Sequence, residues 1–443
     1  MHVIVVGAGQ VGSTIAASLA QSHDVVVIDV DRERVESLTY SIDVLAVEGD
    51  GASLDTLEEA GIGDADMLIA STDEDETNIV TCGTAKTAGD AFTIARVKNT
   101  NFLNTWQRSE GAFGVDHMVG TNLLTAQEVV RVIGLPAARD VDAFANDSVR
   151  MAEFEITAES PIADQTVQEA DRFESLTFAA VLRDEEVVVP TGGTVIEPGN
   201  DVVVIGSPES VREFAASVAP DADGVTDVLV VGGSDIGYHI ARLLERQGLK
   251  PRLIERDPER ARELAEELTK TTVMEHDATD REFLERENID EVDAVVAALD
   301  SDEKSMLSGL LAKRLGAERA ITIVDDGSYV KLFEEVGIDV AVNPREATAE
   351  EITRFTREQQ AENVAIIESD RAEVMEIEVD EDSVLVDRPI RESVADLPDG
   401  VVIGAITRNG ELVKPRGDTV IRADDHVVVF VDAEAIEEAT AEL

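Results

Sequence analysis

The chain has 443 residues, 44% of them hydrophobic but only 4% aromatic, and it carries 93 acidic against 37 basic side chains, a formal net charge of −56. This length exceeds one ordinary core, so we expect two or more domains with aliphatic interiors. The negative charge disfavours direct binding to nucleic acid or anionic lipid. The single cysteine excludes an internal disulfide or a cysteine-based metal cluster, and no apolar run is long enough to span a bilayer.

The acidic residues are spread over the whole length rather than gathered in a tail. Two interpretations fit this balance: a cation-binding or acidic-decoy protein, and a halophilic protein whose carboxylates keep its surface hydrated while salt screens their repulsion. We favour the second. Because the start of the chain does not resemble a signal peptide, we expect a cytoplasmic protein whose contact with a membrane goes through a protein partner.

The chain opens on a strand, a glycine-rich turn and a helix. Residues 3–6 are β-branched, as in a strand buried on both faces, and the second strand, residues 25–28, ends on Asp29. The turn between them matches G-x-G-x-x-G and consists of Gly7, Ala8, Gly9, Gln10, Val11 and Gly12. This order predicts a dinucleotide or adenine-nucleotide site, with phosphates at the helix N-terminus and Asp29 on the ribose hydroxyls. The first glycine permits the tight turn, the second lets the backbone approach a pyrophosphate, and the third lets helix and strand pack closely. The alternative is a Rossmann fold whose glycines serve packing alone.

Strand and helix patterns then alternate to about residue 120. Further strands are expected at residues 44–47, 67–70, 93–97 and 116–119, and helices at 32–40, 54–60, 76–87 and 101–111. Six strands with five crossovers complete a Rossmann sheet, which ligands approach at the carboxyl ends of its strands. The polar residues at or just after these ends are Asp29, Asp50, Thr72, Asp73 and Arg96. Their clustering indicates a nucleotide site.

A long amphipathic helix is predicted at residues 121–134, after the sheet is complete, so its apolar face needs a partner elsewhere. Short alternating strands follow, at residues 149–156, 177–182, 187–189 and 202–205, with a helix near 208–217. They predict a small α+β module. Residues 220–224 are polar and turn-prone, as in a linker.

The whole pattern is then repeated. Glu255 corresponds to Asp29, but Ser234 replaces the middle glycine and Ile323 stands in the place of Arg96. These changes predict weaker or different binding, so the second half either keeps a weak adenosine-type site or is purely structural. Its candidate residues are Gly232, Gly233, Ser234, Asp235, Ile236 and Glu255.

Arg96 is the most informative single residue, since a buried charge at a strand end requires a partner. A phosphate would pair with it, and so would Asp29, Asp50 or Asp73. The acidic run at residues 73–76 could suggest a divalent cation, but we interpret it as a solvated loop. We find no nucleophile elbow, P-loop lysine or metal-ligand spacing, so no catalytic residues and no metal are predicted.

On these residues, the chain resembles the TrkA family, peripheral subunits of Trk potassium-uptake systems built from two tandem RCK (regulator of potassium conductance) units. The similar motifs are VGAGQVG, IDVDRER, ADMLIASTDEDETN and IARV, together with the repeat of the whole unit. The resemblance implies that residues 7–11, Asp29, Thr72, Asp73 and Arg96 bind NAD(H) or ATP/ADP. It also implies TrkA C-terminal-type modules, assembly of a homo-oligomeric ring, a dimer or tetramer, beneath a TrkH-like membrane channel, and gating by nucleotide.

The predicted fold is therefore α/β, with two Rossmann-type doubly wound parallel sheets, each followed by a small α+β module. The predicted domains are residues 1–134, 135–220, 225–357 and 358–443. We expect a cytoplasmic nucleotide-sensing subunit, not an enzyme, that regulates potassium influx. An NAD-dependent oxidoreductase is the alternative, and a structural assembly with vestigial pockets is a third possibility.

Overall fold

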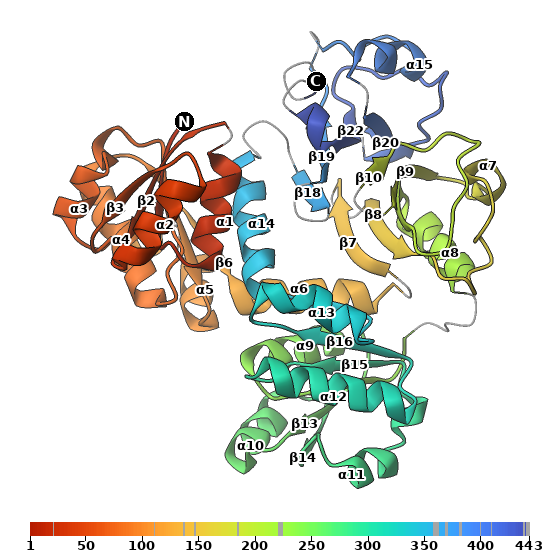
Figure 1. The fold of residues 1–443 in the computed structure, drawn as a ribbon, viewed down its shortest axis with the longest axis horizontal. Helices are drawn as coiled ribbons and strands as arrows, with labels where there is room; N and C mark the ends of the chain where they lie inside the picture. Colours follow the sequence, from red (N-terminus) through yellow and green to blue (C-terminus); the bar gives the residue numbers. More distant parts are fainter. Residues whose placement is uncertain are drawn as a thin grey trace. The chain divides into compact units, whose positions relative to one another are not determined.

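The computed structural model describes residues 1–20, 22–109, 111–135, 138–145, 148–183, 186–219, 225–357, 363–367, 371–380, 383–398, 400–408, 410–436 and 439. The chain divides into two compact units, whose helices and strands are labelled in Figure 1. One comprises residues 1–130 and 226–353, and the other comprises residues 131–225 and 354–443. The linker predicted at residues 220–224 lies outside the described residues.

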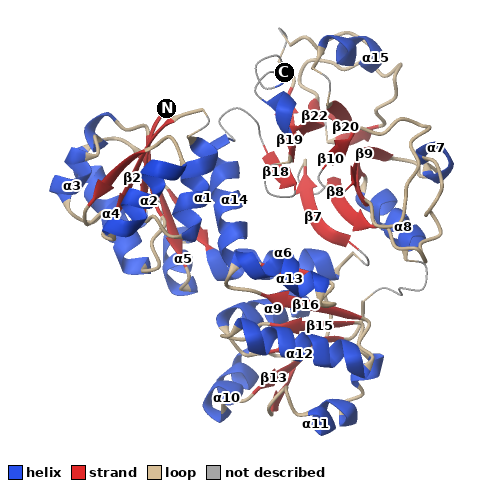
Figure 2. Ribbon diagram, viewed as in Figure 1, coloured by secondary structure: helices blue, strands red, loops and turns tan. Residues whose placement is uncertain are grey.

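The first unit contains two parallel sheets covered by helices (Figure 2). The sheet of the first Rossmann half has the strand order β3-β2-β1-β4-β5-β6. Its strands are β1 (His2–Val6), β2 (Asp24–Asp29), β3 (Leu45–Glu48), β4 (Met67–Ala70), β5 (Phe92–Val97) and β6 (His117–Gly120). Its helices are α1 (Gln10–Leu19), α2 (Arg32–Ser41), α3 (Leu54–Glu59), α4 (Asp75–Ala88), α5 (Thr100–Gln107) and α6 (Thr121–Ile133). Strands β1 and β4 are almost wholly buried, as expected for central strands covered on both faces.

The second Rossmann half repeats this order as β14-β13-β12-β15-β16-β17. Its strands are β12 (Val228–Val231), β13 (Arg252–Glu255), β14 (Thr272–Glu275), β15 (Ala294–Ala297), β16 (Arg319–Ile323) and β17 (Val340–Val342). Its helices are α9 (Asp235–Arg246), α10 (Pro258–Glu267), α11 (Arg281–Arg286), α12 (Asp302–Leu315), α13 (Val330–Glu335) and α14 (Pro344–Arg357). The predicted pair of doubly wound sheets is confirmed.

The two Rossmann halves contact each other within this unit. The Thr121 and Thr348 hydroxyls lie 3.2 Å apart between α6 and α14, and Thr100 Oγ1 lies 2.8 Å from Nε2 of the buried His239. The apolar face of α6, predicted to need a partner beyond its own sheet, is buried.

The second unit contains two antiparallel five-stranded sheets, ordered β10-β9-β11-β8-β7 and β18-β19-β22-β20-β21. Their strands are β7 (Ala138–Phe144), β8 (Val149–Glu155), β9 (Leu176–Arg183), β10 (Glu186–Val188), β11 (Asp201–Gly206), β18 (Asn363–Ile367), β19 (Ala372–Glu378), β20 (Val401–Arg408), β21 (Glu411–Val413) and β22 (His426–Asp432). Their helices are α7 (Val167–Ala170), α8 (Pro208–Val218) and α15 (Ile390–Ser393). One cluster of buried side chains, including Met151, Ile205, Val374 and Phe430, spans both sheets, so the modules share a core.

Strand β7 and the end of helix α5 differ from the sequence prediction, and the short helices α7 and α15 were not predicted. Strand β7 was not predicted, because a bulge near Ala138 leaves only Ala138, Val141 and Phe144 buried and so removes the alternating pattern. The helix predicted at residues 101–111 ends at Gln107, and Gly111, with φ of +68°, starts a separate short turn.

Candidate functional site

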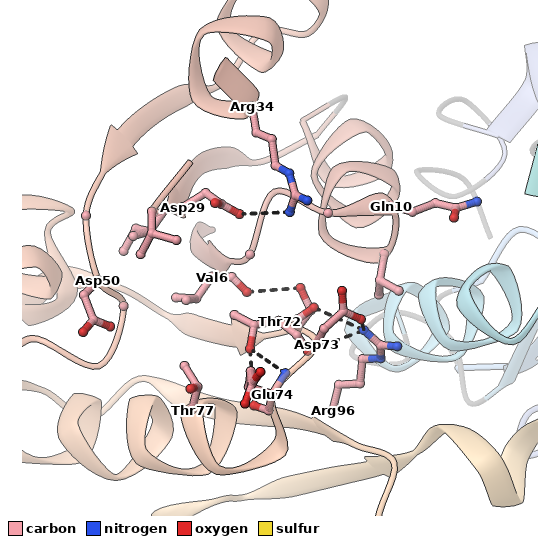
Figure 3. A pocket seen from close by; sticks show the side chains of 18 of the residues that line it. Val6, Gln10, Asp29, Arg34, Asp50, Thr72, Asp73, Glu74, Thr77 and Arg96 are labelled. Carbon is pink, nitrogen blue, oxygen red and sulfur yellow. Dashed lines mark hydrogen bonds and ion pairs between the residues drawn. The ribbon is translucent and has the colours of Figure 1, made fainter. Parts of the chain in front are cut away.

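A cavity of about 460 Å³ lies at the carboxyl ends of the central strands of the first Rossmann half. Figure 3 shows its side chains, with Asp29 and Arg34 at one end and Asp73 and Arg96 at the other. The predicted site residues that line it are Gly7, Gly9, Gln10, Val11, Asp29, Asp50, Thr72, Asp73 and Arg96. This volume is within the usual range for small-molecule sites, roughly 300–1,000 Å³.

The three glycines of the turn have different roles. Gly7 has φ of +104°, which favours glycine, and a Cβ on Gly12 would lie 1.8 Å from the Gly7 carbonyl oxygen. These two glycines are therefore required by the fold. Around Gly9, by contrast, the nearest heavy atom to an added Cβ would be Arg34 Nη1, at 3.8 Å. No neighbouring group packs against Gly9, so the absence of a side chain there enlarges the cavity.

Helix α1 begins at this open position. Its N-cap is Gly9, and no side chain caps its first turn. The free backbone N–H groups and the dipole of a helix N-terminus favour an anion. The turn therefore presents an uncapped helix N-terminus, with Gln10 and Val11, to the cavity.

Asp29 lies at the end of β2 and is 8% exposed. One carboxylate oxygen accepts from the Ala8 N–H at 2.6 Å and the other from the Asp31 N–H at 2.8 Å. Each oxygen keeps a second acceptor position, so the group can still receive hydroxyl donors. Ala8 and Gly12 do not line the cavity. The Ala8 N–H binds Asp29, and Gly12 packs against Gly7.

Arg96 is 3% exposed and is weakly paired. Its hydrogen bonds are all 3.3–3.5 Å long, to the Thr121 hydroxyl, the Asp73 carboxylate and two backbone carbonyls. Within the described part of the chain, its Nη2 has no hydrogen-bond partner. Burial lowers the pKa of Arg96, and Asp73 only partly opposes this effect. The guanidinium has been moved out of water without a strong internal partner, so it is suited to bind an anion.

Asp73 is the internal partner that the sequence allowed for Arg96. Its side chain is 62% exposed and lies 3.4 Å from Arg96 and 3.3 Å from Lys98. Burial raises the pKa of the Asp73 carboxyl, but Lys98, Arg96 and Arg345 outweigh burial, so the pKa lies below its ordinary value. An exposed carboxylate shared between several cations stabilises a buried guanidinium only weakly.

Asn78, on α4, supports both Thr72 and Arg96 and was missed by the sequence analysis. It is completely buried, and its amide oxygen accepts from the Thr72 N–H at 2.9 Å and from the Thr72 hydroxyl at 2.7 Å. Its amide nitrogen donates to the Arg96 carbonyl at 2.8 Å. A polar residue at the core-facing side of a helix was the signal that could have identified it.

Two further arginines that the sequence analysis missed also line the cavity. Arg34, on α2, has Nη1 4.0 Å from Asp29, and Arg345 comes from α14 of the second Rossmann half. In the sequence, Arg345 is only a charged residue at the start of the second crossover helix. It can be assigned to the cavity only once the structure shows that this helix reaches the first half.

In the second Rossmann half, the corresponding turn is closed by its own side chains. The Ser234 hydroxyl accepts from the Gly237 N–H at 3.2 Å and donates to the Ala298 carbonyl at 2.9 Å. Glu255 accepts from the Gly233 N–H at 2.7 Å, as Asp29 does from the Ala8 N–H in the first half. From α10, Arg260 lies over the turn, because its Nε donates to the Gly233 carbonyl at 2.8 Å.

A smaller cavity of about 270 Å³ adjoins this second turn. Ser234, Asp235 and Ile236 line it together with Arg96 and Arg345, whereas Gly232, Gly233 and Glu255 do not. The structure thus brings only part of the predicted second site to a cavity, and it places the two arginines between the two cavities.

The acidic run at residues 73–76 has a structural role. The Asp75 carboxylate accepts from the backbone N–H groups of Lys98 and Asn99 at 2.8–3.0 Å. Over the described residues, no group of three or more histidine, cysteine or acidic side chains is placed to hold a metal ion. None of the described helices has both the length and the apolar character that crossing a membrane requires.

Two family models match most of the chain. The TrkA-N domain matches residues 3–121 and 228–344, and the TrkA-C domain matches residues 151–219 and 374–443. These matches correspond to the two Rossmann halves and the two antiparallel modules.

Named relatives match this chain over almost its whole length. The Trk system potassium uptake protein TrkA homolog 1 of Methanosarcina mazei is 37% identical over 446 residues, covering 99% of each chain. The Trk system potassium uptake protein TrkA of Vibrio alginolyticus is 34% identical over 440 residues, covering 97% of this chain and 96% of its own. Among solved structures, the GsuK channel bound to NAD matches all of this chain and 78% of its own, with a TM-score of 0.60 and 18% identity, and it shares the fold.

Proposed function

The chain belongs to the TrkA family, and we propose that it binds NAD(H) or ATP/ADP in the first Rossmann half and thereby regulates a membrane potassium transporter. The observation that supports nucleotide binding most directly is the weakly paired, buried Arg96, across a cavity from Asp29 and beside the open turn at Gly9. Asp29 would accept the ribose hydroxyls, the N-terminus of α1 would bind the pyrophosphate, and Arg96 would pair with phosphate charge.

Regulation would come from unequal binding to two arrangements of the protein. A nucleotide shifts such an equilibrium only by the difference in its affinity for the two arrangements. A site at which the two Rossmann halves meet offers that difference, because Arg345 of the second half lines the cavity of the first. The partner would be a TrkH-like channel subunit, reached from the cytoplasmic side by a homo-oligomeric ring, a dimer or a tetramer.

The closed second turn supports one nucleotide per chain. The Ser234 hydroxyl already binds the Gly237 N–H and the Ala298 carbonyl, whereas Gly9 leaves the corresponding place in the first turn open. A phosphate would have to displace these contacts as well as Arg260. We therefore expect a titration with NADH, ATP or ADP to give a single site per chain.

The proposal is tested by calorimetric titration of these nucleotides into the protein in molar potassium chloride. The variant to compare is Arg96→Ile, since Ile323 fills the corresponding position of the second sheet and is buried there. Loss of a charge-assisted contact is expected to weaken binding by about 10- to 100-fold.

A matched control removes an arginine far from the cavity. Arg281→Ile, on α11, replaces a side chain that is 65% exposed and pairs with Glu285. It should bind nucleotide as the unchanged protein does. Unchanged affinity in Arg96→Ile contradicts the phosphate role of Arg96, and absence of binding by the unchanged protein contradicts the proposed function.

The competing function is that of an NAD-dependent oxidoreductase. It requires a base and a substrate-binding group aimed at the nicotinamide position. We assign no such pair among the described residues around the cavity. Incubation with NADH and candidate substrates separates the two functions: stoichiometric binding without cofactor oxidation supports a sensor, and sustained turnover supports an enzyme.

A further inference from the structure

Each antiparallel module carries a pair of loops, and the two pairs are folded alike. In the first module, residues 164–170 lie against residues 189–197, and in the second module, residues 387–393 lie against residues 414–422. Each pair is joined by one isolated antiparallel bridge and by matching backbone hydrogen bonds of 2.8–3.4 Å. The short helices α7 and α15, labelled in Figure 1, occupy the same place in the two pairs. The loop pairs therefore share a backbone and are distinguished by their side chains.

These side chains differ in charge. The loop pair of the second module has five basic and three acidic residues, whereas that of the first module has three acidic residues and no basic one. The basic residues and their counterparts in the first module are Arg388 and Gln165, Arg391 and Gln168, Lys414 and Val189, Arg416 and Thr191, and Arg422 and Glu197. We call the two surfaces the basic and the acidic loop pair. In a chain with 93 acidic and 37 basic side chains, the basic loop pair departs from the overall composition.

Three of these cations have no acidic partner in their own chain. Arg391, Arg416 and Arg422 are exposed, and within the described ranges none of them forms an ion pair. Lys414 is used internally, since its Nζ donates to the Phe173 carbonyl of the first module at 3.2 Å. Three guanidinium groups are thus left to contact another molecule.

The chemistry of these groups favours a partner that carries carboxylates, which arginine binds in a two-pronged geometry. The cytoplasmic loops of a membrane channel carry an excess of lysine and arginine, so they would be repelled. Anionic lipid is also disfavoured, because three acidic residues lie among the five basic ones and the chain as a whole is strongly negative.

The acidic loop pair of a second copy of this chain offers such carboxylates. Asp164 and Glu197 are exposed there, and neither forms an ion pair in the part of the chain that the structure describes. Asp171 and Glu174 follow α7 and are exposed as well. In 1 M salt the repulsion between two acidic copies is screened over about 3 Å, so ion pairs in direct contact determine where the copies associate.

We propose that the basic loop pair of one copy binds the acidic loop pair of a second copy of this chain. Because each copy carries both loop pairs, a two-fold axis would form the contact twice and close a dimer, and a rotation of higher order would close a ring. The inference does not require nucleotide in the first Rossmann half. It extends the proposed function, because it names a surface through which the homo-oligomer would form.

The first test is disulfide cross-linking between two variants of the full chain that each carry one added cysteine. Gly192→Cys and Gly417→Cys stand at equivalent positions of the acidic and the basic loop pair, and an added Cβ would meet its nearest neighbour at 3.5 and 3.6 Å, an ordinary contact. Under mild oxidation, a mixture of the two variants should give a covalent dimer, and each variant alone should give much less. Cys82 is buried and should stay unreactive.

The second test measures self-association by sedimentation velocity over a range of protein concentrations. The double variant Arg391→Gln/Arg416→Thr carries the residues of the first module, so its loops should fold unchanged. It should raise the dissociation constant of self-association by about 10- to 100-fold. The matched control is Arg256→Gln/Arg262→Gln, which removes two exposed arginines of the second Rossmann half and should leave the constant within about twofold.

The inference is overturned if the mixture gives no more cross-linked dimer than the single variants, or if the loop-pair and control variants self-associate equally. It is also overturned if the unchanged protein stays monomeric and instead binds vesicles of anionic phospholipid through these arginines. Nucleotide titration of Arg391→Gln/Arg416→Thr separates this inference from the proposed function. Its nucleotide affinity should equal that of the unchanged protein, and an absence of nucleotide binding by both would contradict the proposed function alone.

Discussion

Replacing Gly9 with alanine should abolish tight nucleotide binding without unfolding the protein. Gly9 has φ of −72° and ψ of −174°, a conformation open to any residue. The added Cβ would meet only Arg34 Nη1, at 3.8 Å. The new methyl group would therefore occupy the cavity where a phosphate approaches the helix N-terminus.

Two small effects on stability oppose each other. Alanine restricts the unfolded chain and stabilises by about 0.4–1 kcal/mol at a compatible position. Alanine is also a poorer N-cap than glycine, by an amount of similar order. We therefore expect the free energy of unfolding to stay within about 1 kcal/mol. The effect on binding is larger, because displacing a phosphate from even one charge-assisted N–H contact costs about 1.5–3 kcal/mol, roughly a 10- to 100-fold loss of affinity.

The assay pairs calorimetric titration of nucleotide with thermal unfolding of the free protein. Gly12→Ala is the contrasting variant, since its Cβ would lie 1.8 Å from the Gly7 carbonyl oxygen and 2.9 Å from the Ser71 hydroxyl. It should lower the melting temperature strongly or prevent folding. Wild-type affinity in Gly9→Ala would refute the assignment of the open turn as the phosphate site.

Three other predictions concern buried polar groups. Burial lowers the pKa of His239, and the nearby carboxylate of Asp235 only partly opposes this effect. The unfolded chain takes up the proton near pH 6.5, so the free energy of unfolding should fall as the pH drops below about 6.5. His239→Gln should remove this dependence in denaturant titrations at several pH values. Burial and the neighbouring carboxylate of Asp142 raise the pKa of Asp140 to about 7. The free energy of unfolding should therefore decrease as the pH rises from about 4 to 7. Asp140→Asn should reduce this decrease in the same titrations. Asn78→Ala leaves the backbone of residues 72 and 96 without buried partners, so we expect about 2–4 kcal/mol lower stability by denaturant unfolding and weaker nucleotide binding by calorimetry.

Local and periodic features were predictable from the amino-acid sequence. The turn at residues 7–12, the buried strands around it and the whole-chain repeat all follow from spacing within short segments. The difference between the two turns was also predictable, since Ser234 and Ile323 stand where the first half has Gly9 and Arg96. Strand β7 was not, because its bulge replaces the alternating pattern with a spacing of three.

Only the tertiary structure decided which arginines line the cavity. The motif predicts separate roles for Gly7, Gly9 and Gly12, and their surroundings agree, since only an added Cβ at Gly9 would have room. Arg345 is 335 residues from Gln10 along the chain, and no local pattern relates the two. Residues that line a cavity from the other Rossmann half are positioned by the packing of whole sheets and helices. The sequence by itself therefore determined the glycine turn, and the folded chain determined what surrounds it.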